Sequence, residues 1–156
     1  MIKDWLFSDE TSICHFRVAG VLIRENKVLL QKHDGEYALP GGYVVFGETS
    51  EDALIREINE EMGIIISCER LIWVEENFWN WGRKKAHNIS FYYSISLADS
   101  TGIVDDFIKV SKDNINVQFQ WVPIDELNKI TVYPHFIKDE INNISGDVKH
   151  FVRNAW

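Results

Sequence analysis

Cysteine, proline and long apolar runs are all scarce in this sequence of 156 residues, which has two cysteines and three prolines. Cys14 and Cys68 form no CxxC pair, so we expect no disulfide framework and predict that both side chains are buried. No apolar run approaches the roughly 20 residues that span a bilayer. The N-terminal MIKDWLFSDETS has acidic residues where a signal peptide needs an apolar segment. We therefore predict no membrane association and a cytoplasmic location.

Positive charge is also scarce, because 16 lysines and arginines face 24 acidic residues and leave a formal net charge of −8. A surface this acidic disfavours binding to nucleic acid polymers and to anionic lipids. It permits a phosphorylated small molecule when a cation lies between the ligand and the acids. With 46% hydrophobic residues and no internal repeat or linker, residues 1–156 are expected to form a single domain.

Hydrophobic patterns along the chain predict strands on either side of a helix. The predicted strands are 13–23, 27–33, 64–76, 87–98 and 117–122. The first two are expected to form a hairpin, and segment 34–42 is expected to be a loop. The predicted helices are 50–62, 123–127 and a segment around 134–144. Elements in this order indicate an α/β fold with a mixed β-sheet packed between helices.

The helix at 50–62 has clear signals at both ends. Thr49 or Ser50 is a suitable N-cap, and Gly63 is a suitable C-cap. Its buried face is predicted to consist of Leu54, Ile55, Ile58 and Met62, which recur at helical spacing. This pattern makes the helix the best defined element of the sequence.

Three carboxylates share one face near the end of this helix. Glu57, Glu60 and Glu61 stand at i, i+3 and i+4, where each like-charge pair costs a few tenths of a kcal/mol, about 0.2–0.5. Acids in the last turn also oppose the helix macrodipole, at about 0.3–1 kcal/mol each. A solvated acidic face is the alternative to a functional one. Since Arg56 alone cannot neutralise three acids and Glu48, we predict a bound divalent cation, with Mg²⁺ or Mn²⁺ favoured by oxygen ligands.

These residues fit a known motif, together with the glycines that precede the helix. Gly42 is followed after five residues by Glu48 and after seven more by Arg56-Glu57-Ile58-Asn59-Glu60-Glu61-Met62-Gly63-Ile64. This arrangement resembles the Nudix box at every specified position. The hairpin before it and the segment WVPIDEL after it also resemble the Nudix hydrolase family, so the resemblance covers about 13–144.

The resemblance implies a Nudix-type α/β/α sandwich with a mixed β-sheet. It also implies hydrolysis of a nucleoside diphosphate linked to another moiety. Glu57 and Glu61 would then be the principal metal ligands, with help from Glu60 and from the carbonyl of Gly41. Glu57 is our first choice for the general base, which makes it both a catalytic and a metal-binding residue.

The same resemblance assigns supporting roles around the acids. Arg56 would hold Glu57 in place, while Glu48 would form a salt bridge within the loop and helix or bind the metal through water. Gly42 and Gly63 would support the loop before the helix and its end. The catalytic set implied by the family is therefore Glu57, Arg56 and Glu60.

Two departures from the family leave the supporting acids open. Gln118 stands where an acid is common in relatives, and Asn88 stands where a Glu is common. Asp113 or the pair Asp105–Asp106 could supply the missing acid. A solvated acidic loop is the alternative interpretation of these aspartates.

Substrate contacts are suggested by the segment ENFWNWGRKKAH, where aromatic residues adjoin a basic cluster. Trp79 or Trp81 could stack on a base and Arg83, Lys84 or Lys85 could meet a phosphate. Packing against the core or a second subunit is the alternative for the aromatic residues. Tyr37 is a candidate for the pocket wall and Arg17 for a phosphate contact, with ordinary structural roles as the alternative.

These observations lead to one functional expectation with two alternatives. We expect Mg²⁺-dependent hydrolysis of a diphosphate linkage in a nucleotide sugar or an ADP-ribose-like compound. A nucleoside triphosphate pyrophosphohydrolase and a nucleotide-sensing Nudix module without catalysis are the alternatives. The expected partner is a small nucleotide derivative rather than a nucleic acid polymer or a membrane, and a homodimer is possible.

Overall fold

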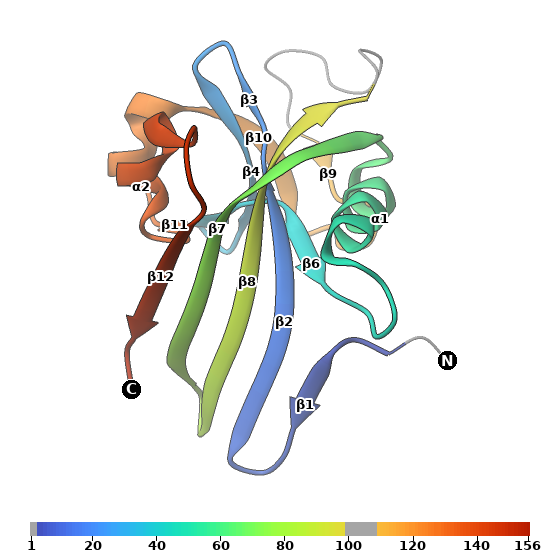
Figure 1. Ribbon diagram of the computed structural model, residues 1–156, viewed down its shortest axis with the longest axis vertical. Coiled ribbons are helices and arrows are strands. Elements are labelled where there is room, and N and C mark those ends of the chain that lie inside the picture. The colour runs from blue at the N-terminus through green and yellow to red at the C-terminus, as the bar shows by residue number, and fades with distance from the viewer. Residues whose placement is uncertain (1–2, 99–108) are drawn as a thin grey trace.

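The structure, a computed structural model, describes residues 3–98 and 109–156 (Figure 1). Its first sheet has the strand order β1 (Leu6–Ser8), β2 (Ser12–Val21), β8 (Lys84–Leu97), β7 (Ile66–Trp81) and β12 (Lys149–Asn154), with β6 (Gly41–Tyr43) also paired to β2. Strands β2 and β8 are parallel, as are β7 and β12, whereas β7 and β8 form a long antiparallel hairpin.

The second sheet has the order β11 (Val132–Tyr133), β5 (Glu36–Ala38), β4 (Lys27–His33), β10 (Gln118–Pro123) and β9 (Lys109–Val110), with β3 (Ile23–Arg24) also paired to β4. Strands β5 and β11 are parallel, and β4 is antiparallel to both β5 and β10. Both sheets are therefore mixed. The predicted α/β class and mixed strand pairing are confirmed.

Helices lie on opposite sides of the strands in Figure 1, with α1 (Ser50–Met62) on one side and α2 (Ile137–Glu140) on the other. Two 3₁₀ helices, η1 (Ile124–Lys129) and η2 (Ile141–Asn143), accompany α2. The predicted helices are thus present, although η1 is a 3₁₀ helix and the segment predicted around 134–144 contains only the short helices α2 and η2. None of the helices within the described residues has the length and apolar character that a membrane crossing requires.

The ends of α1 follow the sequence signals. The Thr49 hydroxyl accepts a hydrogen bond from the Asp52 backbone N–H at 3.1 Å, which satisfies one of the free donors of the first turn. Gly63 ends the helix at φ 70°, in the left-handed region, and its N–H donates to the Asn59 carbonyl at 2.7 Å. The predicted bounds and both caps are confirmed.

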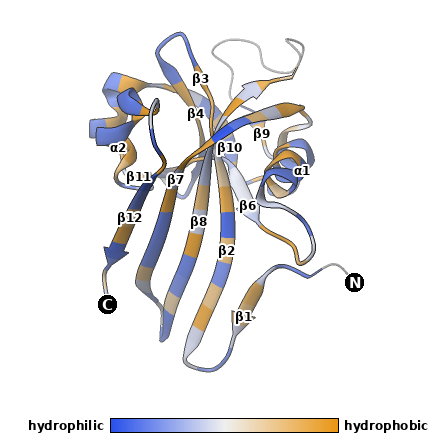
Figure 2. Ribbon diagram, in the orientation of Figure 1, coloured by the Kyte–Doolittle hydropathy of each residue, from blue (hydrophilic) through white to orange (hydrophobic). Residues whose placement is uncertain are grey.

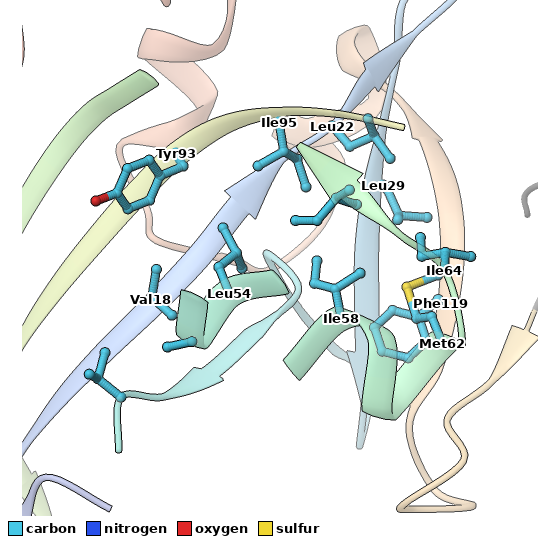
Figure 3. Close-up of a cluster of buried hydrophobic side chains, with 13 residues drawn as sticks. Val18, Leu22, Leu29, Leu54, Ile58, Met62, Ile64, Tyr93, Ile95 and Phe119 are labelled. Carbon is cyan, nitrogen blue, oxygen red and sulfur yellow. The ribbon is translucent and has the colours of Figure 1, made fainter. Parts of the chain in front are cut away.

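The apolar face of α1 packs where the two sheets meet. Figure 3 shows the cluster that joins α1 to both sheets, including Val18, Leu29, Leu54, Ile58, Met62 and Phe119. Burying each large side chain of this kind stabilises the fold by about 1.5–3 kcal/mol. Ile55 is only partly buried, so the predicted stripe is narrower than expected. A second buried cluster lies on the α2 side and includes Leu39, Ile72, Trp73, Leu127 and Ile137.

Some local predictions are wrong. The predicted hairpin forms only between Ile23–Arg24 and β4. The rest of the first predicted strand, β2, pairs along its whole length with β8 in the other sheet. The segment predicted as a loop contains β5 and β6. Cys14 is exposed and Cys68 is partly buried, and both are free. Cys14 is exposed because the alternation of side chains along β2 places it on the face opposite to that of its buried neighbours, Ile13 and His15.

Candidate active site

The Arg56 guanidinium connects the loop before α1 to the acidic face of the helix. Its Nε and Nη2 donate to the two Glu48 carboxylate oxygens at 3.1 and 2.7 Å, a bidentate pair. Its Nη1 donates to Glu57 Oε1 at 2.8 Å and to Glu60 Oε2 at 3.2 Å. The Tyr43 carbonyl accepts the remaining bond from Nη2 at 3.1 Å. One arginine therefore contacts three of the four acids grouped in the sequence.

Glu48 fixes the loop through two kinds of contact. In addition to the Arg56 pair, its Oε1 accepts the Val45 backbone N–H at 2.7 Å. The Arg56 hydrogen bond is the main reason that the pKa of Glu48 is lowered, and the Val45 bond adds to it. The Glu48 side chain, which is 19% exposed, is therefore held ionised between the loop and the helix.

The two glycines before the helix are needed for close packing. A Cβ on Gly41 would overlap the Val18 carbonyl of β2, and a Cβ on Gly42 would overlap the Glu57 carboxylate. Gly42 therefore leaves the space in which the Glu57 side chain lies. Packing alone explains Gly41, so its carbonyl as a metal ligand stays a prediction.

Glu61 is the acid that Arg56 does not reach. Its Oε2 is buried and has no hydrogen-bond partner among the described residues. The pKa of Glu61 is raised to about 7, mainly by burial and also by the negative charges of Glu57 and Asp113, with Arg17 acting in the opposite direction. A buried carboxylate without a donor is costly, so this oxygen is a position where a positively charged ligand would be favoured.

Two lysines from outside α1 contact the C-terminal end of the helix, which lacks positive charge of its own. α1 has no basic residue in its last turn. The Lys109 ammonium donates to the Met62 carbonyl, and the Lys112 backbone N–H donates to the Glu61 carbonyl at 2.9 Å. These contacts satisfy terminal carbonyls and place positive charge at the negative end of the macrodipole.

The carboxylates of α1 suit a hard cation, although they do not yet enclose one. Within the described residues, no three His, Cys, Asp or Glu side chains converge closely enough to hold a metal ion as they stand. Glu57 and Glu60 are instead turned toward Arg56. Three features fit a divalent ion: oxygen donors, the unpartnered Glu61 oxygen and the space that Gly42 leaves at Glu57.

A pocket of about 500 Å³ lies on the face of the first sheet that carries Arg17. Residues of β2, β7 and β8 form its floor, and the opposite wall includes Glu36, Ala38, Leu39, Tyr133, Pro134 and His135. The Arg17 guanidinium lies over the Tyr43 ring, 5.5 Å from its centroid. Because Arg17 lines the pocket and also lowers the pKa of Glu61, it lies between the pocket and the acids of α1.

The pocket brings together some of the predicted substrate residues. Arg17, Trp79 and Trp81 line it, whereas Tyr37 and Arg83 are not among the lining residues. The Tyr37 hydroxyl is instead within 3.1 Å of the Gln120 amide, which donates to it, because β5 turns this side chain toward β10. Arg83 is exposed in the turn between β7 and β8, so the hairpin directs it away from the pocket.

The candidate acids outside the motif also differ in their distance from the acids of α1. Asp113 is close enough to raise the pKa of Glu61, so it is the aspartate that approaches the acidic face. Gln118 is exposed on β10. Asp105 and Asp106 lie outside the described residues.

Several pocket residues were not predicted from the sequence. The additional polar lining residues are His15, Glu75, Asn77, Asn88, Ser90, Tyr92 and Arg153. The signal that could have identified some of them is alternation, because Glu75 and Asn77 share one face of β7 with Trp79. Figure 2 shows the hydrophilic stretch on this part of β7.

Comparison with known sequences gives matches over most of the chain. An ADP-ribose pyrophosphatase of Methanocaldococcus jannaschii is 45% identical over 62 residues, which are 36% of this chain and 37% of that protein. The 8-oxo-dGDP phosphatase of Homo sapiens is 32% identical over 119 residues, which are 72% of this chain and 33% of that protein. The chain thus matches well under half the length of these curated relatives.

Solved structures share the fold at low sequence identity. A UDP-X diphosphatase superimposes with a TM-score of 0.64 at 19% identity, covering 93% of this chain and 69% of that one. A mutator MutT protein from Bacillus halodurans gives 0.67 at 16% identity, covering 90% of both chains. The sequence model of the NUDIX domain matches residues 15–139. Because this match covers far more than half of the chain, the protein belongs to the NUDIX domain family.

Proposed function

We propose that this protein hydrolyses a diphosphate linkage in a nucleoside diphosphate derivative. The observation that carries the proposal is the buried, unpartnered carboxylate oxygen of Glu61 beside Glu57, with Arg17 leading from it into the pocket. Hydrolases of this family generally use divalent metal ions. Two relatives, an ADP-ribose pyrophosphatase and an 8-oxo-dGDP phosphatase, support a substrate that contains a nucleoside diphosphate.

The acids of α1 would hold the ion, which we propose to be Mg²⁺ or Mn²⁺. Glu57 and Glu61 are the proposed principal ligands, with Glu60 and the Gly41 carbonyl assisting. When bound, such an ion would neutralise charge on the diphosphate and polarise its phosphorus–oxygen bonds. Glu60 is 50% exposed, so its side chain is free to turn from Arg56 at little cost.

The other residues would bind and orient the substrate. Arg17 is placed to meet a phosphate with its planar fork, and Trp79 offers a ring for the base. Glu57 is the proposed general base, and Arg56 is a positioning residue that holds it at 2.8 Å. A carboxylate of this kind needs an unblocked oxygen toward the attacking water, and Arg56 occupies only Oε1.

The proposal extends to the whole chain. We propose that residues 1–156 act as one domain in the cytoplasm on a small nucleotide derivative. A homodimer is supported by β1, an edge strand, because Phe7 within it and Trp5 just before it are each 59% exposed. The net charge of −8 supports the expectation that no nucleic acid polymer binds.

A substrate screen tests the proposed function directly. Nucleotide sugars, ADP-ribose, nucleoside diphosphates and triphosphates, dinucleoside polyphosphates and coenzyme A would be incubated with Mg²⁺ or Mn²⁺. We expect cleavage of at least one diphosphate and no cleavage in EDTA. Binding of nucleotides without turnover of any compound would contradict the proposal and indicate a sensor.

Metal binding has its own readout, independent of turnover. We expect Mg²⁺ or Mn²⁺ to raise the melting temperature, because an ion at 100 times its dissociation constant stabilises the folded state by about 2.7 kcal/mol. Glu61→Gln should reduce this stabilisation, whereas Glu126→Gln, a change to a half-exposed acid on η1, should leave it intact. An unchanged melting temperature in wild-type protein at millimolar metal would contradict an ion site on α1.

Replacing Gly42 by alanine should displace the Glu57 carboxylate. We expect turnover to fall about a hundredfold, because misplacing a catalytic group by about 1 Å costs on this order. The measurement is kcat on the substrate found in the screen, together with the melting temperature. Gly35→Ala serves as the control for kcat, since a Cβ there meets no atom within 4 Å; at φ 83° the alanine is strained, so its melting temperature should fall while kcat stays unchanged. Full activity in Gly42→Ala would show that the space at Gly42 is not used by Glu57.

A further inference from the structure

The floor of the pocket carries a row of polar side chains that the proposed metal chemistry does not use. His15 on β2 is paired in register with Asn88 on β8, and Asn88 is paired with Asn77 on β7. His15 and Asn88 are 8% and 5% exposed, and all three residues line the pocket. Because directly paired residues point to the same face of a sheet, the three side chains lie side by side.

Each member of this row has a buried polar atom without a partner. Among the described residues, His15 Nδ1, Asn77 Oδ1 and Asn88 Oδ1 have no hydrogen bond. Buried polar atoms are normally paired, and a group of them facing one pocket indicates a missing ligand. Burial lowers the pKa of His15 to about 4, so its imidazole is neutral at physiological pH.

A chain of hydrogen bonds fixes the direction of the Asn88 amide. The Tyr92 hydroxyl donates its one hydrogen to Glu75 Oε2 at 2.7 Å. Burial raises the pKa of Tyr92 well above its ordinary value, and a hydrogen bond with Ser90 opposes this rise. The Ser90 hydroxyl is the donor in that bond, because the Tyr92 hydrogen is already used. The Asn88 amide nitrogen then donates to Ser90 Oγ at 2.6 Å. This order leaves Asn88 Oδ1, an acceptor, as the free atom of the amide.

The hydrogen bond from Tyr92 to Glu75 anchors this order. An ionised carboxylate only accepts hydrogen bonds, so Tyr92 must donate to it. Burial raises the pKa of Glu75, but the Tyr92 hydrogen bond and the positive charge of Arg153 oppose this rise. Glu75, Tyr92 and Ser90 therefore act as positioning residues for Asn88.

Two neighbouring amide oxygens select for a ligand with two neighbouring N–H donors. The Watson–Crick edge of guanine presents its ring N–H beside its exocyclic amino group. Adenine and cytosine have a ring acceptor beside their amino group, and uracil has one N–H between two carbonyls. We propose, on the basis of the proposed nucleotide hydrolase function, that Asn77 and Asn88 select guanine as the base of the substrate.

The surroundings of the row fit a planar base. The His15 ring is in edge contact with Tyr43 and with Trp79, at centroid distances of 5.0 and 5.9 Å. These aromatic residues provide surfaces on which a base can stack. The pocket volume of about 500 Å³ lies within the usual range for small-molecule sites. Arg17, the next residue after His15 on the same face of β2, would meet the phosphate of the bound nucleotide.

Binding of nucleoside monophosphates tests this selectivity without hydrolysis. GMP, IMP and AMP would be titrated into the full-length protein with Mg²⁺ present, by calorimetry or tryptophan fluorescence. IMP differs from GMP only by the missing amino group, so we expect GMP to bind about tenfold more tightly, the effect of one hydrogen bond. AMP should bind still more weakly. Equal affinity for the three nucleotides would overturn the proposal.

Variants separate recognition from folding. Asn88→Ala should reduce the GMP-to-AMP preference about tenfold, whichever guanine N–H Asn88 accepts, whereas Asn80→Ala, at an exposed position of β7, should preserve it. Tyr92→Phe keeps the buried ring but breaks the chain, so it should lower the GMP-to-AMP ratio. A stable Asn88→Ala protein with undiminished preference would refute the role of Asn88.

The outcomes for base selectivity and for hydrolysis are independent. Metal-dependent hydrolysis with equal binding of GMP, IMP and AMP would refute guanine selection and leave the proposed function standing. Preferred GMP binding with no hydrolysis in any divalent ion would refute the proposed function and support the guanine pocket.

Discussion

Glu57→Gln should lower turnover about a thousandfold or more. Glutamine occupies the same volume but carries no charge, so it weakens metal binding and cannot accept a proton from water. A thousandfold loss corresponds to about 4 kcal/mol of transition-state stabilisation. The measurement is kcat under saturating substrate and metal, because kcat separates loss of chemistry from weaker substrate binding.

A matched variant controls for removing an acid from this helix. Glu51→Gln makes the same chemical change in the first turn of α1, where the side chain is exposed. We expect its kcat to stay within about twofold of wild type, with a small loss of stability from the helix dipole, about 0.3–1 kcal/mol. If Glu57→Gln retained activity within a few-fold while Glu51→Gln behaved as expected, Glu57 would be neither a ligand nor the base.

Arg56→Ala should destabilise the fold by about 2–3 kcal/mol, between the values for exposed and for buried ion pairs. The guanidinium is 28% exposed and Glu48 is 19% exposed, so solvent screens the contacts only partly. Its removal leaves Glu48 and Glu57 facing each other without compensation. For a chain of this size we expect the melting temperature to fall by about 5–10 °C. Urea denaturation and calorimetry check this value.

The chemistry of the Arg56 contact can be tested in two further ways. Arg56→Lys keeps the charge but loses the bidentate fork, so it should recover less than half of the lost stability. The difference between wild type and Arg56→Ala should shrink as the pH falls below the ordinary Glu48 pKa of 4.5, because Arg56 lowers that pKa in the folded state. A difference that is independent of pH would show that packing, not the ion pair, stabilises the loop.

The two halves of the proposed site are joined by β2. This strand contributes His15 and Arg17 to the pocket and pairs with β6, whose Gly42 adjoins Glu57. A nucleotide bound with its base at His15 would therefore extend its phosphates past Arg17 toward α1. Changes on the pocket floor should alter substrate choice, whereas changes on α1 should alter chemistry.

Local patterns were sufficient to define α1. Thr49, Gly63 and the apolar stripe between them act over neighbouring residues, so the bounds of α1 followed from spacing alone. The pairing of β2 did not follow from local spacing. A strand that precedes a tight turn, here at Glu25–Asn26, is expected to pair with the strand that follows the turn. Its partner, β8, is more than sixty residues away in the chain.

The sequence by itself determined the bounds of α1, the order of the acids on it and the mixed α/β class of the fold. It also predicted that the acids need positive charge. Only the tertiary structure decided which groups satisfy the end of α1, since the Lys109 ammonium and the Lys112 backbone N–H reach its last carbonyls from a distant segment. The arrangement of side chains on the pocket floor also depends on the tertiary structure. His15, Asn88 and Asn77 meet because of strand register, a long-range property that no local pattern of residues specifies.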